Sequence, residues 1–292
     1  MKLIKFLIIE MRPKQWIKNM FIFAPVVFSQ NFLNFKYIEK SFVAFFLFSF
    51  ITGSIYIFND CIDYENDKNH PKKRFRPIAA GKIKRRSALY FSIILLTVML
   101  TAGYIFNSDF FLLALIYVIL NILYSIYLKK IAVFDVFIIA IGFVLRVMIG
   151  GEVNNIYLSP WIFIITFLLA LFLGLVKRRQ ELDGMDEKNE SFTRDSLKNY
   201  SIPFLDQLIS ITTSATLISY IVYVVNPDVQ SYFHTKELYL TVPFVIFGIF
   251  RYIFLTYMKN KGEVPEEIIF SDFPFLINIV LWILVFIFII YF

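Results

Sequence analysis

Nine apolar stretches divide the chain, and they constrain its fold more than any other feature of the sequence. They lie approximately at residues 19–35, 41–58, 88–106, 110–128, 133–150, 160–176, 209–226, 238–257 and 274–291. Each is close to the roughly 20 residues that an α-helix needs to cross a hydrocarbon core. Strands of a β-barrel would alternate apolar and polar residues, whereas these stretches are apolar all round. The sequence therefore predicts an all-α, polytopic membrane protein with about nine transmembrane helices.

The composition excludes an ordinary soluble protein. Of the 292 residues, 59% are apolar and 17% are charged, against about 45–50% and 25% in soluble domains. One cysteine and two histidines exclude a disulfide framework and a Cys/His zinc site. Because spans joined by short loops use the whole chain, we expect residues 1–292 to form a single transmembrane domain.

Lysine and arginine gather in alternate connectors, which predicts the orientation. The N-terminal arm and the connectors after spans two, four, six and eight hold 24 of the 29 basic residues. The positive-inside rule then places the N-terminus in the cytoplasm and the C-terminus outside, in a plasma membrane. The two longest connectors, at about 59–87 and 177–208, are cytoplasmic in this topology, so the active site is expected there. The net charge of +7 indicates contact with a membrane surface and implies no nucleic acid partner.

An acidic cluster follows the second span. The run from Asn59 to Asp67 reads N-D-x-x-D-x-x-x-D. If the helix continues, Asn59, Asp63 and Asp67 share one face, and Asp60 lies beside Asp63. Clustered carboxylates need a cation, and hard oxygen ligands suit Mg²⁺. A solvated helix end is the alternative.

A basic run follows the acidic cluster directly. The candidates for binding a metal-bound polyphosphate are Lys73, Arg74 and Arg76, because cations neutralise the phosphate oxygens that the metal leaves. Pro77 stiffens this segment and Gly81 permits a tight turn. The alternative is a loop whose charges only set the topology.

These two runs carry a family resemblance. The acidic run followed by R-P-I-A-A-G at 76–81 resembles the UbiA superfamily of intramembrane prenyltransferases. The opening R-P-K-Q-W-I-K-N at 12–19 and the segments 134–137, 142–146, 177–182 and 250–252 are similar to a subgroup that transfers phosphoribose to decaprenyl phosphate. The resemblance spans roughly the whole chain. It implies a nine-helix bundle with a cytoplasmic-facing cavity for Mg²⁺ and a diphosphate. The expected metal ligands are then Asn59, Asp60, Asp63 and Asp67, and the three aspartates are the expected catalytic residues.

A second segment departs from the superfamily pattern. Prenyltransferases of this superfamily carry another Asp-rich motif after the sixth span, whereas this chain has K-R-R-Q-E-L at 177–182. We expect Lys177, Arg178 and Arg179 to offset the charge of a second phosphorylated substrate, and Glu181 remains a candidate contact to substrate or metal. A stop-transfer cluster at a cytoplasmic helix end is the alternative.

Four further cations complete the candidate set. Lys14 and Lys18 of the opening motif are expected to face phosphate. Arg146 and Arg251 lie within apolar sequence, where an unpaired arginine costs at least about 2.5–3.5 kcal/mol, so each needs a partner. For Arg146 an outer acid such as Glu152 is one possibility, and for Arg251 a phosphate or an aspartate in the cavity.

The resemblance implies transfer of 5-phosphoribose from phosphoribosyl pyrophosphate to a polyprenyl phosphate lipid, with Mg²⁺. A phosphate nucleophile suits this reaction, because its second pKa is near 6 and it needs no general base. A prenyltransferase of the same fold acting on an aromatic or other acceptor is the nearest alternative, and a lipid-phosphate transporter is an alternative of another class. The sequence leaves the polyprenyl length and a homo-oligomeric state open.

Overall fold

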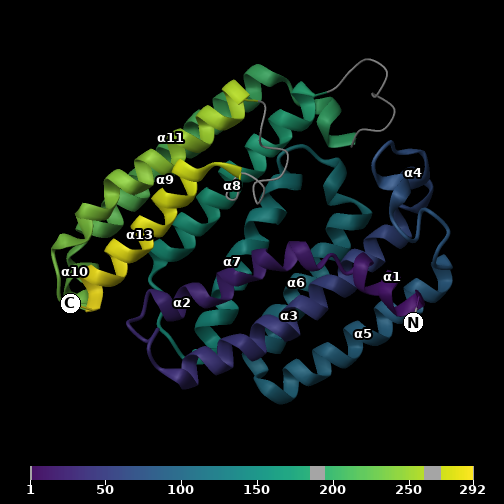
Figure 1. The fold of residues 1–292 in the computed structure, drawn as a ribbon, viewed down its shortest axis with the longest axis horizontal. Coiled ribbons are helices and arrows are strands. Elements are labelled where there is room, and N and C mark those ends of the chain that lie inside the picture. The colour runs from purple at the N-terminus through teal and green to yellow at the C-terminus, as the bar shows by residue number, and fades with distance from the viewer. Residues whose placement is uncertain (1, 185–194, 260–270, 292) are drawn as a thin grey trace. The chain divides into compact units, whose positions relative to one another are not determined.

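The computed structural model describes residues 2–184, 195–259 and 271–291, and its helices fall into two compact units. Among the described residues, one unit holds residues 2–158 together with Asp195, and the other holds residues 159–184, 196–259 and 271–291. Figure 1 shows the helices of both units along the chain. The single domain expected over 1–292 stays a prediction, and the connector at 177–208 lies partly outside the described residues.

The first unit is built around one long helix, α3 (Phe35–Ile62), which packs against α5 (Arg85–Phe106), α6 (Ser108–Ile126) and α7 (Phe134–Asn154). Its core gathers buried side chains of α3, α6 and α7, among them Phe48, Phe110, Tyr117 and Ile149. In chain order its elements are α1 (Lys2–Glu10), the 3-10 helix η1 (Pro13–Phe23), α2 (Ala24–Val27), α3, α4 (Tyr64–Asn69), η2 (Lys73–Phe75), α5 (Arg85–Phe106), α6 (Ser108–Ile126), η3 (Leu128–Lys130) and α7 (Phe134–Asn154).

In the second unit, several helices start at residues that favour helix initiation. The side chains of Ser159, Ser201 and Asn226 accept backbone N–H groups of the first turns of α8 (Pro160–Asp183), α9 (Ile202–Val225) and α10 (Pro227–Phe233). A proline in each first turn adds a preset backbone angle without losing a hydrogen bond. The remaining elements are η5 (Asp195–Asn199), η6 (Glu237–Thr241), α11 (Val242–Lys259) and α13 (Phe273–Tyr291).

Eight helical segments are long and apolar enough to cross a membrane, counted over the described residues. They are 35–62, 85–106, 108–126, 134–154, 160–183, 202–225, 237–258 and 273–291. No strand occurs in the part of the chain that the structure describes. The prediction of an all-α integral membrane protein is therefore confirmed, and eight of the nine apolar stretches correspond to these segments.

The first apolar stretch differs from its prediction as a transmembrane α-helix. It forms the end of η1 and the four-residue α2, followed by a turn. The same segment approaches α7 closely: a Cβ on Gly150 would lie 2.0 Å from the carbonyl oxygen of Ile22, so glycine lets the η1 backbone pack there. A hydropathy profile depends on composition alone and contains no information about such a contact.

The η1 segment nevertheless runs antiparallel along α3. Arg12 meets Asp60 near one end of α3, the Trp16 ring meets the Phe50 ring at 5.5 Å, and Phe23 meets Phe42 at 5.0 Å toward the other end. With a 3-10 rise of about 2.0 Å per residue, eleven residues cover roughly 22 Å. Nine membrane crossings, with the termini on opposite sides, stay a prediction.

Candidate active site

The acidic cluster lies where α3 passes into α4. The chain bends at Asp63, yet its backbone N–H donates to the Asn59 carbonyl at 2.9 Å, and the Asp67 N–H donates to the Asp63 carbonyl at 2.8 Å. These i to i+4 hydrogen bonds carry the helical register through the bend. The spacing expected for Asn59, Asp63 and Asp67 is therefore present in the backbone.

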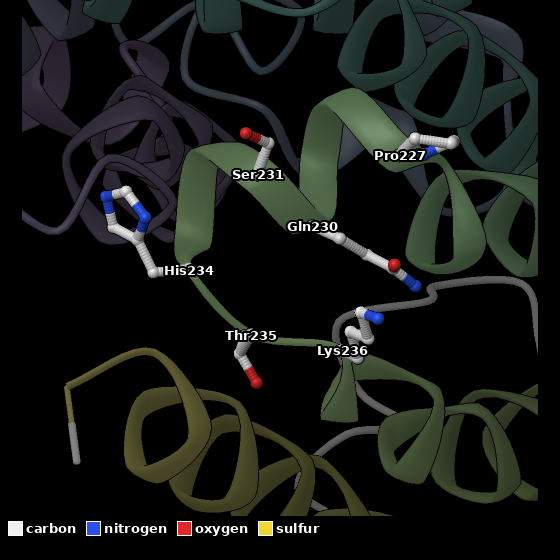
Figure 2. Close-up of a pocket in the computed structure, with 6 residues that line it drawn as sticks. All are labelled: Pro227, Gln230, Ser231, His234, Thr235 and Lys236. Carbon is white, nitrogen blue, oxygen red and sulfur yellow. The ribbon is translucent and has the colours of Figure 1, made fainter.

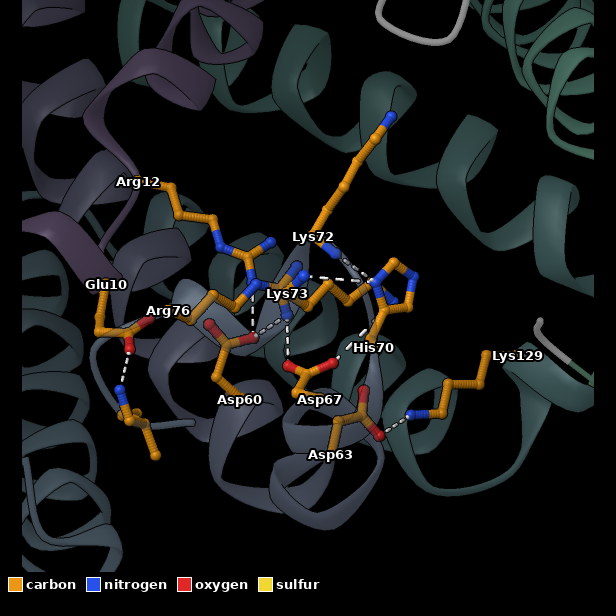
Figure 3. A network of polar contacts seen from close by, with 11 residues as sticks. Glu10, Arg12, Asp60, Asp63, Asp67, His70, Lys72, Lys73, Arg76 and Lys129 are labelled. Atoms are coloured by element: carbon orange, nitrogen blue, oxygen red, sulfur yellow. Dashed lines mark hydrogen bonds and ion pairs between the residues drawn. The ribbon is translucent and has the colours of Figure 1, made fainter. Parts of the chain in front are cut away.

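Two arginines converge on the carboxylates (Figure 3). Arg12 Nη2 and Arg76 Nη1 both donate to Asp60 Oδ1, at 2.5 and 2.9 Å. The same Arg76 nitrogen donates to Asp67 Oδ2 at 2.6 Å, and the Lys73 ammonium lies 4.0 Å from Asp67 Oδ1. Arg76, a predicted phosphate ligand, thus bridges two predicted metal ligands.

Asp63 has a different partner. Lys129 Nζ donates to Asp63 Oδ1 at 2.6 Å, from the η3 turn between α6 and α7. Within the described residues, no three His, Cys, Asp or Glu side chains stand in the geometry of a metal site. The four-residue Mg²⁺ ligand set accordingly stays a prediction.

Two buried oxygens of the cluster nevertheless fit a hard cation. Asn59 Oδ1 and Asp60 Oδ2 are buried and accept no hydrogen bond from a described residue. A buried oxygen without a donor is costly, and a metal ion is one way to satisfy it. Amide and carboxylate oxygens are ligands that Mg²⁺ accepts. The donor set present here is therefore compatible with Mg²⁺.

Glu10 and Arg12 belong to this site although residue patterns alone did not single them out. Glu10 is 1% exposed, and its Oε1 accepts the backbone N–H of Ile78 at 2.6 Å. Burial raises the pKa of Glu10 to about 7, and the neighbouring Asp60 carboxyl adds to this rise. The Arg12 guanidinium lies 5.0 Å over the Tyr56 ring, on a left-handed backbone with φ of 53°. A left-handed residue other than glycine is strained, and such strain is concentrated at functional sites.

Neighbouring ionisable groups respond to the same burial. Burial raises the pKa of Asp67, while Arg76 and Lys73 oppose the rise. Burial and then the charge of Lys73 and Arg76 lower the pKa of His70.

Arg74, Lys14 and Lys18 are the remaining predicted phosphate ligands of the first unit. Arg74 is exposed, with its guanidinium 4.9 Å over the Phe75 ring. Lys14 is exposed and Lys18 is half-buried, both on η1. Their contact with phosphate stays a prediction.

The basic segment of the second unit is held by acids of the same unit. Arg178 is 1% exposed and its Nη1 donates to Glu181 at 2.6 Å. Arg179 donates to Asp206 at 2.6 Å and lies 4.0 Å over the Tyr257 ring. Lys177 is half-buried. A role of this segment in binding a second phosphorylated substrate remains untested by these contacts.

The two arginines within apolar sequence both have partners. Arg251 forms a two-pronged pair with Asp272, at 3.0 and 2.9 Å, so an aspartate is its partner here. The suggestion of Glu152 for Arg146 is wrong. Arg146 donates instead to Asn19 Oδ1 at 2.9 Å, to the Gly142 carbonyl at 2.6 Å and to the Tyr117 hydroxyl at 3.1 Å.

A separate pocket lies between α10 and η6 in the second unit (Figure 2). Its lining residues are Pro227, Gln230, Ser231, His234, Thr235 and Lys236. None of these is a carboxylate or an arginine. The pocket therefore lacks the groups that would hold a metal-bound diphosphate.

A sequence model of the UbiA prenyltransferase family matches residues 22–271. The chain belongs to this family. Among UbiA-family relatives, decaprenyl-phosphate phosphoribosyltransferase from Mycolicibacterium smegmatis is 31% identical over 96% of this chain and 91% of its own length. The enzyme of the same name from Mycobacterium tuberculosis is 29% identical over 89% of this chain and 86% of its own. Digeranylgeranylglyceryl phosphate synthase from Methanosphaera stadtmanae is 27% identical over 73% of this chain and 74% of its own.

Solved structures support the UbiA fold. A UbiA homolog from Archaeoglobus fulgidus bound to GPP and Mg²⁺ superposes with a TM-score of 0.71 at 19% identity, over 98% of this chain and 99% of that one. A digeranylgeranylglyceryl phosphate synthase superposes with a TM-score of 0.67 at 23% identity, over 99% of each chain. The protein is thus an integral membrane transferase of the UbiA family.

Proposed function

We propose that this UbiA-family protein transfers 5-phosphoribose from phosphoribosyl pyrophosphate to a polyprenyl phosphate, releasing pyrophosphate with the help of Mg²⁺. The observation that carries the proposal is the 31% identity, over nearly the whole chain, to a decaprenyl-phosphate phosphoribosyltransferase. The opening R-P-K-Q-W-I-K-N motif and the basic K-R-R-Q-E-L segment agree with it.

The donor pyrophosphate is assigned to the acidic cluster. Asn59, Asp60, Asp63 and Asp67 would hold Mg²⁺, which neutralises charge on the departing pyrophosphate when it is bound. Arg12 and Arg76, whose guanidinium groups already meet at Asp60, would donate to the remaining phosphate oxygens. Together these residues fix the leaving group in place, and positioning is the main need of such a reaction.

The acceptor needs no general base. The lipid phosphate is mostly dianionic at neutral pH, since its second pKa is near 6. The bond from ribosyl C1 to pyrophosphate breaks with oxocarbenium character, and attack from the opposite face inverts the anomeric carbon. Lys14 and Lys18 on η1, Lys177, Arg178, Arg179 and Glu181 in the second unit, and Arg251 remain the proposed contacts to phosphorylated substrates.

Prenyl transfer is the alternative that one observation favours, because the chain also resembles digeranylgeranylglyceryl phosphate synthases.

Purified protein would be incubated with labelled phosphoribosyl pyrophosphate and polyprenyl phosphate, and separately with a polyprenyl diphosphate and aromatic acids. Labelled lipid and pyrophosphate in the first reaction alone support the proposal. Product only in the second would replace it with prenyl transfer, and absence of pyrophosphate from both would favour a transporter. Asp60→Asn serves as the inactive control.

A further inference from the structure

We propose that Arg12 and Arg76 are exchangeable counterions of the acidic cluster. They neutralise Asp60 and Asp67 in the ligand-free protein and transfer their hydrogen bonds to the diphosphate when a metal-bound diphosphate arrives. The divalent metal and the diphosphate then bind together, and neither binds well alone. This inference rests on the proposed function, in that it concerns how the donor's pyrophosphate group is captured.

The acids and cations of the cluster match in number without a metal. The carboxylates of Asp60, Asp63 and Asp67 face the cations of Arg12, Arg76 and Lys129 within hydrogen-bond distance. One further cation and one further acid lie beside them, since Lys73 is 4.0 Å from Asp67 and the buried Glu10 neighbours Asp60. A bare divalent cation would add two positive charges to a site already neutralised. A bare diphosphate would meet the uncovered carboxylates once it drew the arginines away. A metal–diphosphate complex brings a cation for the carboxylates and anionic oxygens for the arginines at once.

The geometry makes Arg76 and a metal competitors for the same oxygens. One nitrogen, Arg76 Nη1, lies 2.9 Å from Asp60 Oδ1 and 2.6 Å from Asp67 Oδ2. It therefore sits between two carboxylates that would both be needed to hold a divalent cation. Asp60 Oδ1 accepts Arg12 as well, while the buried Oδ2 of the same carboxylate accepts no hydrogen bond from a described residue. Asp60 thus has one oxygen that accepts from two arginines, and a second oxygen that accepts no hydrogen bond from a described residue and belongs to a carboxylate that neighbours the buried Glu10.

The cations also lie outside the carboxylates. The side chains of Asp60 and Asp67 are 3% and 4% exposed, whereas those of Arg12 and Arg76 are 28% and 27% exposed. An anion that approaches from solvent meets guanidinium groups first, and a bare cation is repelled by them. The Tyr56 ring beneath Arg12 offers a platform on which its guanidinium stays stacked while its N–H groups change acceptor.

The test measures binding, so it does not require turnover. Mn²⁺ would stand in for Mg²⁺, and free Mn²⁺ would be followed by electron paramagnetic resonance with the purified full-length protein in detergent. Binding of labelled inorganic pyrophosphate at saturating Mn²⁺ would be measured separately. The variants are Arg76→Ala and Arg12→Ala, and Arg86→Ala, an exposed arginine at the start of α5, is the matched control.

Counterion exchange predicts changes of opposite sign. Arg76→Ala should tighten bare Mn²⁺ binding about tenfold or more, because a competing cation is gone, and should weaken pyrophosphate binding by a similar factor. Arg12→Ala should shift both binding constants in the same directions. Because it retains the Arg76 bridge between Asp60 and Asp67, it provides the test if Arg76→Ala fails to fold. Arg86→Ala should change neither constant.

Two results would overturn the inference: unchanged bare Mn²⁺ affinity in both variants, or a loss of bare Mn²⁺ binding alongside the loss of pyrophosphate binding. The second would mean that the arginines only hold the carboxylates in place. If the opposite responses appear but phosphoribosyl transfer is not detected, the proposed function fails and the exchange stands.

Discussion

Arg146 is a buried cation whose hydrogen bonds all go to neutral groups. The free energy of unfolding should therefore depend on these neutral partners. It is 5% exposed, and its guanidinium lies among three aromatic rings at 4.9–5.4 Å. Asn19 accepts from its Nε at 2.9 Å and also donates to Ser49 on α3 at 2.9 Å. Asn19 thereby links η1 to α3 and α7.

Replacing Asn19 with Leu removes the acceptor and leaves a buried charged donor. A hydrogen bond to a charged group contributes about 1.5–3 kcal/mol, so Asn19→Leu should destabilise the first unit by at least that much. Arg146→Leu alone should lower the free energy of unfolding by about 1–3 kcal/mol. It leaves the buried Asn19 Oδ1 without this donor, and the removal of a buried charge offsets part of the loss. The double variant leaves neither a buried charged donor nor a buried Asn19 oxygen behind. We therefore expect its loss to be smaller than the sum of the single losses by about 1.5–3 kcal/mol.

The assay is a double-mutant cycle on the unfolding free energy in mild detergent, with unfolding temperature as a second readout. Asn154→Leu provides the matched control. Asn154 is a buried asparagine of α7, and its side chain donates to Ser41 at 2.8 Å and to the Gly150 carbonyl at 3.1 Å. Its cycle with Arg146→Leu should be additive. Additive behaviour of Asn19 and Arg146 themselves would refute the reasoning, because it would mean that the pair is not energetically coupled.

Three further predictions concern the candidate site and the basic segment. Asp63→Asn should reduce turnover by orders of magnitude in a folded protein, and retained activity with unchanged Mg²⁺ dependence would contradict its assignment. Glu10→Ala should lower both turnover and unfolding temperature, because Ile78 N–H loses its acceptor, whereas Glu10→Gln should retain most of each; equal losses in the two variants would argue against this role. Arg178→Ala should raise the KM for one of the two phosphorylated substrates and also lower the unfolding temperature, since Arg178 is buried against Glu181; an unchanged KM would contradict the proposed phosphate contact.

Hydropathy located most of the fold because crossing a membrane requires long apolar helices whatever their neighbours. It placed eight stretches correctly and misjudged the first, since composition does not distinguish an α-helix from a 3-10 helix. Composition also does not reveal tertiary contacts of this segment, such as the one between Ile22 and Gly150, which are 128 positions apart in the sequence. A pattern within one segment carries no information about such a contact.

The residues of the candidate site also fall into those that the sequence could place and those that it could not. The register of Asn59, Asp63 and Asp67 follows from helical spacing and was predictable, as was the nearby Arg76. Glu10, Arg12 and Lys129 reach their partners across 68, 48 and 66 positions, so residue spacing could not place them. For Arg12, the only sequence signal was its place at the start of the opening motif.

The basic run after the acidic cluster has two interpretations, binding of phosphate and setting of the membrane topology, and they are compatible with each other. Arg74 and Arg76 are two positions apart, and neither charge nor hydropathy separates them. A turn follows Arg76: the Lys82 N–H donates to the Pro77 carbonyl at 2.8 Å, and Gly81 takes a φ of 73° that other residues rarely adopt. This turn and the bond from Ile78 to Glu10 fix the backbone beside Arg76, whose guanidinium faces the buried carboxylates, while Arg74 remains exposed over Phe75. The positions of Arg74 and Arg76 relative to the carboxylates therefore depend on the fold of the loop, which the charge pattern of the sequence does not contain.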